Sequence, residues 1–363
     1  MSLFVQDSAA PGPEEAALSI EDLTVEFRTP EGTLRAVDGV SYEVGRGEVL
    51  GVVGESGSGK SVTAMSVLGL LPMPPARVVS GRIMFEGEDL LHVSRRRLRE
   101  IRGGRIAMVF QDPMTALNPV FRVGDQLGEA IRKHNPDFSR GDARRRAIDL
   151  LEMVGIPFPA QRYRQYPHQY SGGMRQRVMI AMAIANKPSV LIADEPTTAL
   201  DVTIQAQVLD VLKLAKEETG AATILISHDL GLIAEMADRV AVMYAGRLVE
   251  SASVRDLFAQ PRHPYTRGLI KSVPSLSAEI EALTPIDGQP PDLMHPPSGC
   301  RFHPRCALRR GRSVCVTDQP AFQQIAIGRW SACHFHEEMT GVDGGVREWE
   351  VDNAGSSGGG GVT

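Results

Sequence analysis

Short apolar runs separated by polar turns recur along the chain and predict a buried sheet. Residues at 49–53, 106–110, 190–193 and 222–226 form such runs. Apolar runs of this kind are typical of parallel strands covered on both faces. Residues 18–27 instead alternate like a half-buried strand, and a turn at 29–33 leads to a second strand at 36–44. Further strands are predicted at 80–87 and in a hairpin at 239–251.

Helical spacing of apolar positions fills much of the sequence between these strands. Helices are predicted at 61–70, 125–133, 141–154 and 203–218. Since strands and helices alternate, the fold class is α/β. No buried strand interrupts the mostly helical reading from 123 to 186. We therefore expect a helical subdomain at about 112–187, inserted between two halves of the sheet.

The chain between the first buried strand and its helix is rich in glycine. It reads Gly54, Glu55, Ser56, Gly57, Ser58, Gly59, Lys60 and Ser61. Strand, glycine loop and helix is the context of a P-loop, whose backbone N–H groups surround a phosphate. Lys60 could then reach the β- and γ-phosphates, and the Ser61 hydroxyl could bind Mg²⁺. An ordinary Gly-Ser turn is the alternative, which the lysine-serine pair at this spacing disfavours.

Polar side chains end three of the other predicted strands, where open α/β sheets bind ligands. Asp194 and Glu195 follow one strand, Gln111 another and His228 a third. Asp194 could hold Mg²⁺, Glu195 could deprotonate an attacking water, and His228 could donate to a γ-phosphate. The alternative is that these residues are simple caps of strands and helices.

Two other features could contact a nucleotide. Ser171 is a good N-cap, and Gly172 and Gly173 open the helix that follows, which would give a second anion-binding helix start. Alone, that signal is weak, because Ser-Gly-Gly is common in linkers. Phe27 ends the first alternating strand and could stack on a purine ring or belong to the core.

Composition narrows the class of protein. An apolar content of 42% is enough for a sizeable core. A net charge of −5 and a pI near 6.0 exclude a nucleic-acid binder that is basic over its whole surface. No stretch approaches the ~20 apolar residues of a membrane span, and no signal peptide is visible. We expect a cytosolic chain. Residues 1–17 and 337–363 have the composition of disordered ends.

In this order, the motifs over residues 18–260 resemble the ATP-binding subunit of an ABC transporter. Residues 54–61 resemble the P-loop, Gln111 the Q-loop, 170–174 the signature, 191–195 Walker B, 199–201 the D-loop and His228 the H-loop. Tyr170 and Met174 depart from the usual Leu and Gln of the signature. The resemblance implies a P-loop ATPase of the ABC type with an antiparallel β subdomain. It also implies ATP and Mg²⁺ as cofactors, with Ser61, Gln111 and Asp194 around the metal.

The family architecture implies a head-to-tail dimer, in which ATP lies between the P-loop of one chain and the Ser171 segment of the other. Residues 169–177 and 263–267 further resemble the dipeptide/oligopeptide importer subfamily. That implies a second ATPase subunit in a heterodimer, two transmembrane permease subunits and an extracytoplasmic solute-binding protein. It places the chain at the cytoplasmic face of the cell membrane. Import of nickel or another solute, or a soluble ABC ATPase acting on nucleic acid or ribosomes, are the alternatives.

All four cysteines, Cys300, Cys306, Cys315 and Cys333, lie in a loop-rich extension predicted at 261–336. Clustered cysteines in a reducing compartment suggest a metal rather than disulfides. The subfamily resemblance implies a [4Fe-4S] cluster on these four thiolates. Zn²⁺ with His303, His334 or His336 is the alternative, and unligated cysteines come third. Neighbouring arginines would offset thiolate charge; they are Arg301, Arg305, Arg309, Arg310 and Arg312.

Overall fold

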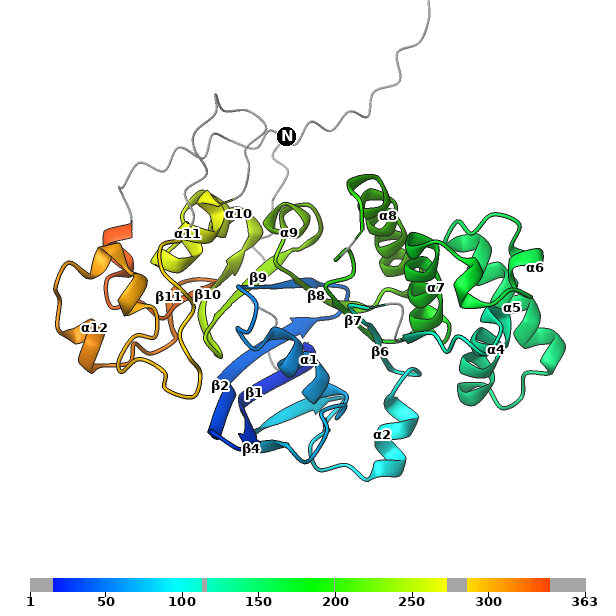
Figure 1. The fold of residues 1–363 in the computed structure, drawn as a ribbon, viewed down its shortest axis with the longest axis horizontal. Helices are drawn as coiled ribbons and strands as arrows, with labels where there is room; N and C mark the ends of the chain where they lie inside the picture. Colours follow the sequence, from blue (N-terminus) through cyan, green and yellow to red (C-terminus); the bar gives the residue numbers. More distant parts are fainter. Residues whose placement is uncertain (1–15, 113–115, 199, 273–285, 340–363) are drawn as a thin grey trace, which may run out of the picture.

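The computed structural model describes residues 16–112, 116–198, 200–272 and 286–339, whose strands form two sheets (Figure 1). The strands are β1 Ala16–Thr29, β2 Gly32–Gly45, β3 Val49–Val53, β4 Ala76–Phe85, β5 Glu88–Asp89, β6 Ile106–Val109, β7 Val190–Asp194, β8 Ala222–Ser227, β9 Arg239–Tyr244, β10 Arg247–Ser253, β11 Gln323–Ala326 and β12 Arg329–Ser331. The helices are α1 Lys60–Val67, α2 Arg95–Ile101, α4 Val123–His134, α5 Arg140–Met153, α6 Pro159–Arg162, α7 Gly172–Ile184, α8 Val202–Thr219, α9 Leu230–Met236, α10 Val254–Ala259, α11 Pro264–Lys271 and α12 Val314–Thr317. Short 3₁₀ turns lie at Pro167–Gln169, His303–Arg305, Ala307–Arg309 and His336–Met339.

The larger sheet has the order β11-β12-β10-β9-β3-β8-β7-β6, and its pairs from β9 to β6 are parallel. Strands β3, β7 and β8 are buried along their whole length, as their uninterrupted apolar runs predicted. Side chains of β3 alternate between two cores: Val49 and Val53 face one, and Leu50 and Val52 the other. Because these strands are parallel, the loops that follow them meet at one edge.

The smaller sheet has the order β2-β1-β4-β5, and its strands are antiparallel. It packs over one face of the larger sheet, where Leu18, Ile20 and Val25 of β1 share a core with Leu50 and Val52. The turn predicted at 29–33 connects β1 to β2, whose residues pair from Thr29 with Gly32 onward. This is the antiparallel β part of the expected fold.

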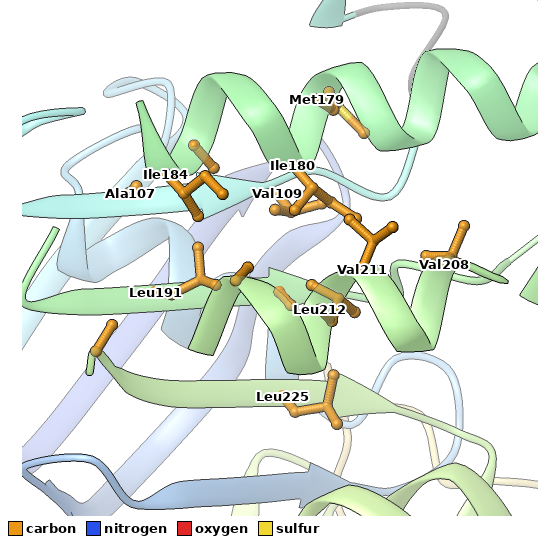
Figure 2. Close-up of a cluster of buried hydrophobic side chains, with 14 of the residues drawn as sticks. Ala107, Val109, Met179, Ile180, Ile184, Leu191, Val208, Val211, Leu212 and Leu225 are labelled. Atoms are coloured by element: carbon orange, nitrogen blue, oxygen red, sulfur yellow. The ribbon is translucent and has the colours of Figure 1, made fainter. Parts of the chain in front are cut away.

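Helices α4 to α7 lie between β6 and β7 in the chain and form the helical part on the right of Figure 1. Figure 2 shows how this part joins the larger sheet: Ile180 and Ile184 of α7 lie over Val109 and Leu191 of the strands. Helix α8 contributes Val208, Val211 and Leu212 to the same core. Gly173 permits the close approach of α7 and α8, because a Cβ there would lie 2.3 Å from Cγ2 of Ile204.

Two features differ from the hydrophobic pattern. The helix predicted at 61–70 ends at Val67, because Gly69 adopts a φ of +57°. The N–H of Leu70 then bonds to the Met65 carbonyl (2.9 Å) in a Schellman motif. The C-terminal extension was expected to be loop-rich, yet its β11–β12 hairpin adds to the edge of the larger sheet, where Trp330 pairs with Ser251.

Parts of the sequence predictions fall on residues outside the described ranges. The disorder expected at 1–17 and 337–363 was wrong at its inner limits, because residues 16–17 begin β1 and residues 337–339 belong to a 3₁₀ turn. The rest of those two ends, residues 1–15 and 340–363, lies outside the described ranges, as does Ala199 of the D-loop. Among the described residues, no helix combines the length and apolar character needed to cross a bilayer.

Candidate functional site

The glycine loop leaves the carboxyl end of β3 and enters α1 at Lys60. A Cβ on Gly54 (φ +153°) would lie 2.1 Å from the Met243 carbonyl oxygen, and one on Gly59 (φ +101°) 2.5 Å from that of Ala36. Gly57 also has a positive φ of +77°, but open space surrounds it. The glycine spacing therefore lets the loop pass close to the neighbouring backbone, as a phosphate-binding loop requires.

Lys60 turns its ammonium group back into this loop. Its Nζ donates to the carbonyl oxygens of Gly54 (2.7 Å) and Glu55 (3.0 Å) and to Ser58 Oγ (3.3 Å). Lys60 is only 5% exposed, and this burial lowers its pKa, against the opposing effect of nearby carboxylates. A buried cation inside a glycine loop at a helix start is a site for a polyanion.

Ser61 and Asp194 meet across the sheet. The Ser61 hydroxyl donates to Asp194 Oδ1 over 2.9 Å, although the residues belong to α1 and β7. Burial raises the pKa of Asp194, while the Ser61 hydrogen bond acts in the opposite direction. Hydroxyl and carboxylate oxygens are the hard ligands that Mg²⁺ prefers, and a divalent cation would keep this buried carboxyl ionised. The predicted pair therefore fits a magnesium site.

Three polar side chains lie around one carboxylate oxygen of Glu195. Its Oε2 accepts from Gln111 Nε2 and from Thr198 Oγ1, each over 2.9 Å, and His228 Nδ1 lies 3.5 Å away. The backbone of Glu195 has a φ of +45°, which is rare outside glycine, and its N–H donates to the Ile226 carbonyl (2.9 Å). Strained backbone of this kind concentrates at functional sites. The carboxylate is held where it could accept a proton from a bound water.

The structure thus brings together the residues predicted at the ends of β3, β6, β7 and β8. Gln111 contacts Glu195, so its predicted place at the metal stays a prediction. His228 has a side chain 61% exposed, beside the same carboxylate. Phe27 is half-buried and packs against the core that the two sheets share, so its stacking role also stays a prediction.

Ser171, Gly172 and Gly173 lie at the start of α7 in the helical part. The Ser171 hydroxyl accepts from the backbone N–H of Met174 (3.3 Å) as an N-cap, and Ser171 and Gly172 are exposed. The helix start that could bind an anion is therefore exposed to solvent.

The two departures from the signature face the interior of the helical part. Tyr170 is buried, its hydroxyl donates to the Arg162 carbonyl (2.8 Å), and burial raises its pKa to about 12. Met174 is half-buried and packs against the same core. Both substitutions therefore alter packing beneath Ser171 and leave the exposed end of the helix intact.

Sequence reasoning missed three residues of the site. Thr198 bonds to Glu195, as described above. Arg305 donates to both carboxylate oxygens of Glu55 (2.7 and 3.0 Å), and the Tyr265 hydroxyl accepts from the Glu55 N–H (2.8 Å). Thr198 could have been found by its position three residues after Glu195. Nothing in the local pattern links Arg305 or Tyr265 to a loop more than 200 residues earlier.

The four cysteines line one small cavity in the C-terminal extension, together with His303, His334 and Arg309. All four are free thiols. Burial raises the pKa of each, to about 11 for Cys300 and about 12 for Cys333. Among the described residues, no group of three or more His, Cys, Asp or Glu side chains is arranged to hold a metal ion.

Of the five arginines near the cavity, Arg310 is exposed and the other four divide into two sets, which corrects the expectation that all five offset thiolate charge. Arg301 and Arg305 instead bond to Asp38 and Glu55 of the ATPase core. Arg309 and Arg312 stay beside Cys315 and lower its pKa, against the larger effect of burial. Arg309 Nε and Arg312 Nη1 are buried without a hydrogen-bond partner in the described part of the chain. Two buried guanidinium donors without acceptors, next to a thiol, are suited to hydrogen-bond a negatively charged group in the cavity.

Comparisons with known proteins agree with this site. A family described as "ABC transporter" matches residues 37–198, and one described as "Oligopeptide/dipeptide transporter, C-terminal region" matches residues 249–315. The dipeptide transport ATP-binding protein DppD of Bacillus subtilis is 55% identical, covering 81% of this chain and 88% of that protein. The oligopeptide transport ATP-binding protein OppD of the same organism is 52% identical, covering 78% of this chain and 80% of that protein.

Solved structures show the same fold. An ATP-binding cassette, solved as a dimer in a post-hydrolysis state with ADP and Pi, has a TM-score of 0.58 and 25% identity to this chain. The match covers 66% of this chain and 99% of the cassette. The fold is therefore the P-loop fold of an ABC cassette, with an inserted helical part, an antiparallel sheet and a C-terminal extension. The chain belongs to the ABC transporter family, as an ATP-hydrolysing protein of its dipeptide and oligopeptide transport branch.

Proposed function

We propose that the chain is the ATPase subunit of an importer of dipeptides or oligopeptides. The observation that carries the proposal is the convergence of Lys60, the Ser61–Asp194 pair and Glu195 at one sheet edge. The substrate class comes from the relatives, whose names describe dipeptide and oligopeptide transport, and from the matching C-terminal region.

In this proposal the residues divide the work of hydrolysis. Lys60 exchanges the carbonyl oxygens of its own loop for β- and γ-phosphate oxygens, which are stronger acceptors. Ser61 and Asp194 would hold Mg²⁺, which would supply positive charge against the phosphates. Glu195 orients the attacking water and accepts its proton, while His228 donates to the γ-phosphate. Gln111, at the junction of the sheet and the helical part, transmits the presence of the γ-phosphate to a partner.

We infer that a second ATPase subunit completes each site, because Ser171 and Gly172 present an exposed helix start on a different part of the same chain. A head-to-tail pair would place that helix start against the partner's glycine loop. A heterodimer is proposed, with two permease subunits and an extracytoplasmic solute-binding protein, at the cytoplasmic face of the cell membrane. Ser171→Arg should then block hydrolysis in the partner's site, in mixtures of mutant and wild-type subunits.

Uptake in a reconstituted system tests the transport function. The chain would be co-purified with its permease subunits, placed in liposomes with the solute-binding protein and supplied with ATP and a labelled dipeptide. ATP-dependent accumulation that is lost in Lys60→Ala supports the proposal. Accumulation of nickel without the peptide would overturn the peptide assignment. Recovery of the chain with ribosomes or nucleic acid would overturn the transport role.

We also propose that Cys300, Cys306, Cys315 and Cys333 hold a [4Fe-4S] cluster. The support is that all four thiols line one cavity and that buried donors of Arg309 and Arg312 lack partners there. The cluster would brace a small extension and could exchange one electron.

Anaerobic purification decides between the metals. Stoichiometric iron and sulfide with a broad visible absorbance, both lost in Cys315→Ser, would support the cluster. A colourless protein with stoichiometric zinc would refute it in favour of the alternative. Anaerobically purified protein that contains neither iron nor zinc, and in which all four cysteines react with a thiol reagent, would refute both kinds of metal centre.

A further inference from the structure

The segment between Cys300 and Cys306 sends two arginines into the ATPase core. Arg301 bonds to Asp38 of β2 and to the Ala245 carbonyl between β9 and β10. Arg305 bonds to Glu55 of the glycine loop. Both ends of the segment line the cysteine cavity, so one short stretch of chain contacts the cavity and the loop at 54–61.

Glu55 is held from two sides. Its carboxylate receives two hydrogen bonds from Arg305, and its N–H donates to the Tyr265 hydroxyl. The Arg305 side chain is 5% exposed and that of Glu55 25%, so solvent screens this pair less than a surface pair. Paired, planar contacts of this kind fix orientation as well as energy.

Arg305 is itself fixed by the C-terminal extension. Its Nε donates to the Asp287 carbonyl (2.9 Å) and its Nη2 to the Ile286 carbonyl (3.2 Å). Its guanidinium also lies 5.8 Å from the ring centroid of Tyr244. A guanidinium held by the extension acts as a fixed support for the glycine loop rather than as a mobile surface charge.

Glu55 also contacts the lysine of the site, because its carbonyl oxygen accepts from Lys60 Nζ (3.0 Å). We propose that Arg305 is a positioning residue for nucleotide binding, and that through it the structure around the four cysteines sets the conformation of the glycine loop. This inference rests on the proposed function, since it requires ATP to bind at this loop.

The link from the cavity to Arg305 is short. Arg305 ends the 3₁₀ turn His303–Arg305 and directly precedes Cys306, whose N–H donates to the His303 carbonyl (3.3 Å). At the other end of the segment, the N–H of Cys300 donates to the carbonyl of Cys315, which also lines the cavity (3.0 Å). Because Arg305 and Cys306 are adjacent in the chain, we expect a change at Cys306 to reach Arg305 directly.

Equilibrium nucleotide binding tests Arg305 in the full-length protein. The affinity for a fluorescent ATP analogue with Mg²⁺ would be measured for Arg305→Gln, Arg305→Lys, Glu55→Gln and the double variant Arg305→Gln/Glu55→Gln. The matched control is Arg310→Gln, an exposed arginine of the same extension. We expect about tenfold weaker binding for Arg305→Gln, partial rescue by Lys, no added loss in the double variant and no change in the control.

Steady-state kinetics separates positioning from simple stabilisation. A positioning role raises KM for ATP and leaves kcat at saturating ATP near the wild-type value. A merely structural role lowers the melting temperature or the active fraction without changing affinity. If Arg305→Gln does not fold, Glu55→Gln tests the same contact from the exposed loop. Wild-type affinity in the folded variants would overturn the inference, whereas a wild-type protein that binds no ATP would overturn the proposed function instead.

The cavity is tested by Cys306→Ser, with nucleotide affinity as the readout. We expect binding to weaken in Cys306→Ser and to weaken no further when this change is added to Arg305→Gln, because both act through one contact. Additive losses in the two variants, or unchanged affinity in Cys306→Ser, would show that the cavity does not act through Arg305.

Discussion

The hydroxyl of Ser61 donates a hydrogen bond to the Asp194 carboxylate over 2.9 Å, across 133 residues of sequence. The contact follows from sheet order, because β3 and β7 both flank β8 and run parallel to it. Their carboxyl ends therefore reach the same edge, and the residues just beyond them face each other.

This pair should govern the magnesium dependence of nucleotide binding. Asp194→Asn removes the charge that would hold the metal, so we expect affinity for ATP in the presence of Mg²⁺ to fall by about tenfold or more. Affinity for ATP in EDTA should change much less. Ser66→Ala is the control, because that hydroxyl bonds to the Val62 carbonyl within α1. Equal losses with and without Mg²⁺ would contradict a metal role.

Loss of the carboxylate at Glu195 should separate binding from turnover. Glu195→Gln keeps the shape and an oxygen for the bonds from Gln111 and Thr198, yet it is a far weaker base. We expect turnover to fall by about 10²-fold or more, with ATP affinity retained and an ATP-bound dimer visible by size-exclusion chromatography. Glu235→Gln, on the surface opposite Lys213, is the control. Sustained turnover in Glu195→Gln would remove the base assignment.

Two glycines of the loop should differ sharply when each is replaced by alanine. At Gly54 the new Cβ would lie 2.1 Å from a backbone oxygen, so we expect the unfolding free energy to fall by more than about 2 kcal/mol. Nucleotide binding should be lost as well. At Gly57 the space is open and only the positive φ is unfavourable, so the loss should be about 1 kcal/mol. Thermal and denaturant unfolding measure both, and equal losses would argue against the close approach at Gly54.

Glu250 should make stability depend on pH. It is 1% exposed, accepts the backbone N–H groups of Arg262 (2.6 Å) and His263 (2.8 Å), and burial raises its pKa from 4.5 to about 7. The folded state then holds a proton that the unfolded state has released, so this stabilisation is complete below pH 4.5 and is lost as the pH rises through 7.

Glu250→Gln cannot titrate, which isolates the effect. The unfolding free energy of the variant minus that of the wild type should rise by about 3 kcal/mol between pH 5 and pH 8. Burial lowers the pKa of His263 to about 3, but this residue is present in both proteins and cancels in the difference. Denaturant unfolding at several pH values gives the difference, and a flat profile would show that Glu250 titrates normally.

Much of the nucleotide site could be predicted because its signals are local. The loop at 54–61 identifies itself by glycine spacing and a lysine-serine pair, and Asp194, Glu195 and His228 follow apolar runs. These local patterns do not specify the hydrogen bonds between the side chains of the site. The amide of Gln111 bonds to Glu195, because β6 adjoins β7 in the sheet, and the place of Gln111 at the metal stays a prediction.

The C-terminal extension was harder to read. Its cysteines and turns indicated loops, but β12 pairs with β10 through backbone groups that any sequence provides. The arginines beside the cysteines looked like one cationic group, and side-chain composition alone could not separate them. Only their neighbours in space assign Arg301 to Asp38 and Arg305 to Glu55, and leave Arg309 and Arg312 at the cavity.

The sequence by itself determined the buried strands of the larger sheet, the glycine loop and the residues that follow those strands, because each depends on side-chain type and spacing within a few residues. Tertiary structure alone decided the pairing of Ser61 with Asp194, the burial of Tyr170 and the support of Glu55 by Arg305 and Tyr265. These contacts join segments from distant parts of the chain. Their geometry depends on sheet order and packing, which no local pattern of residues specifies.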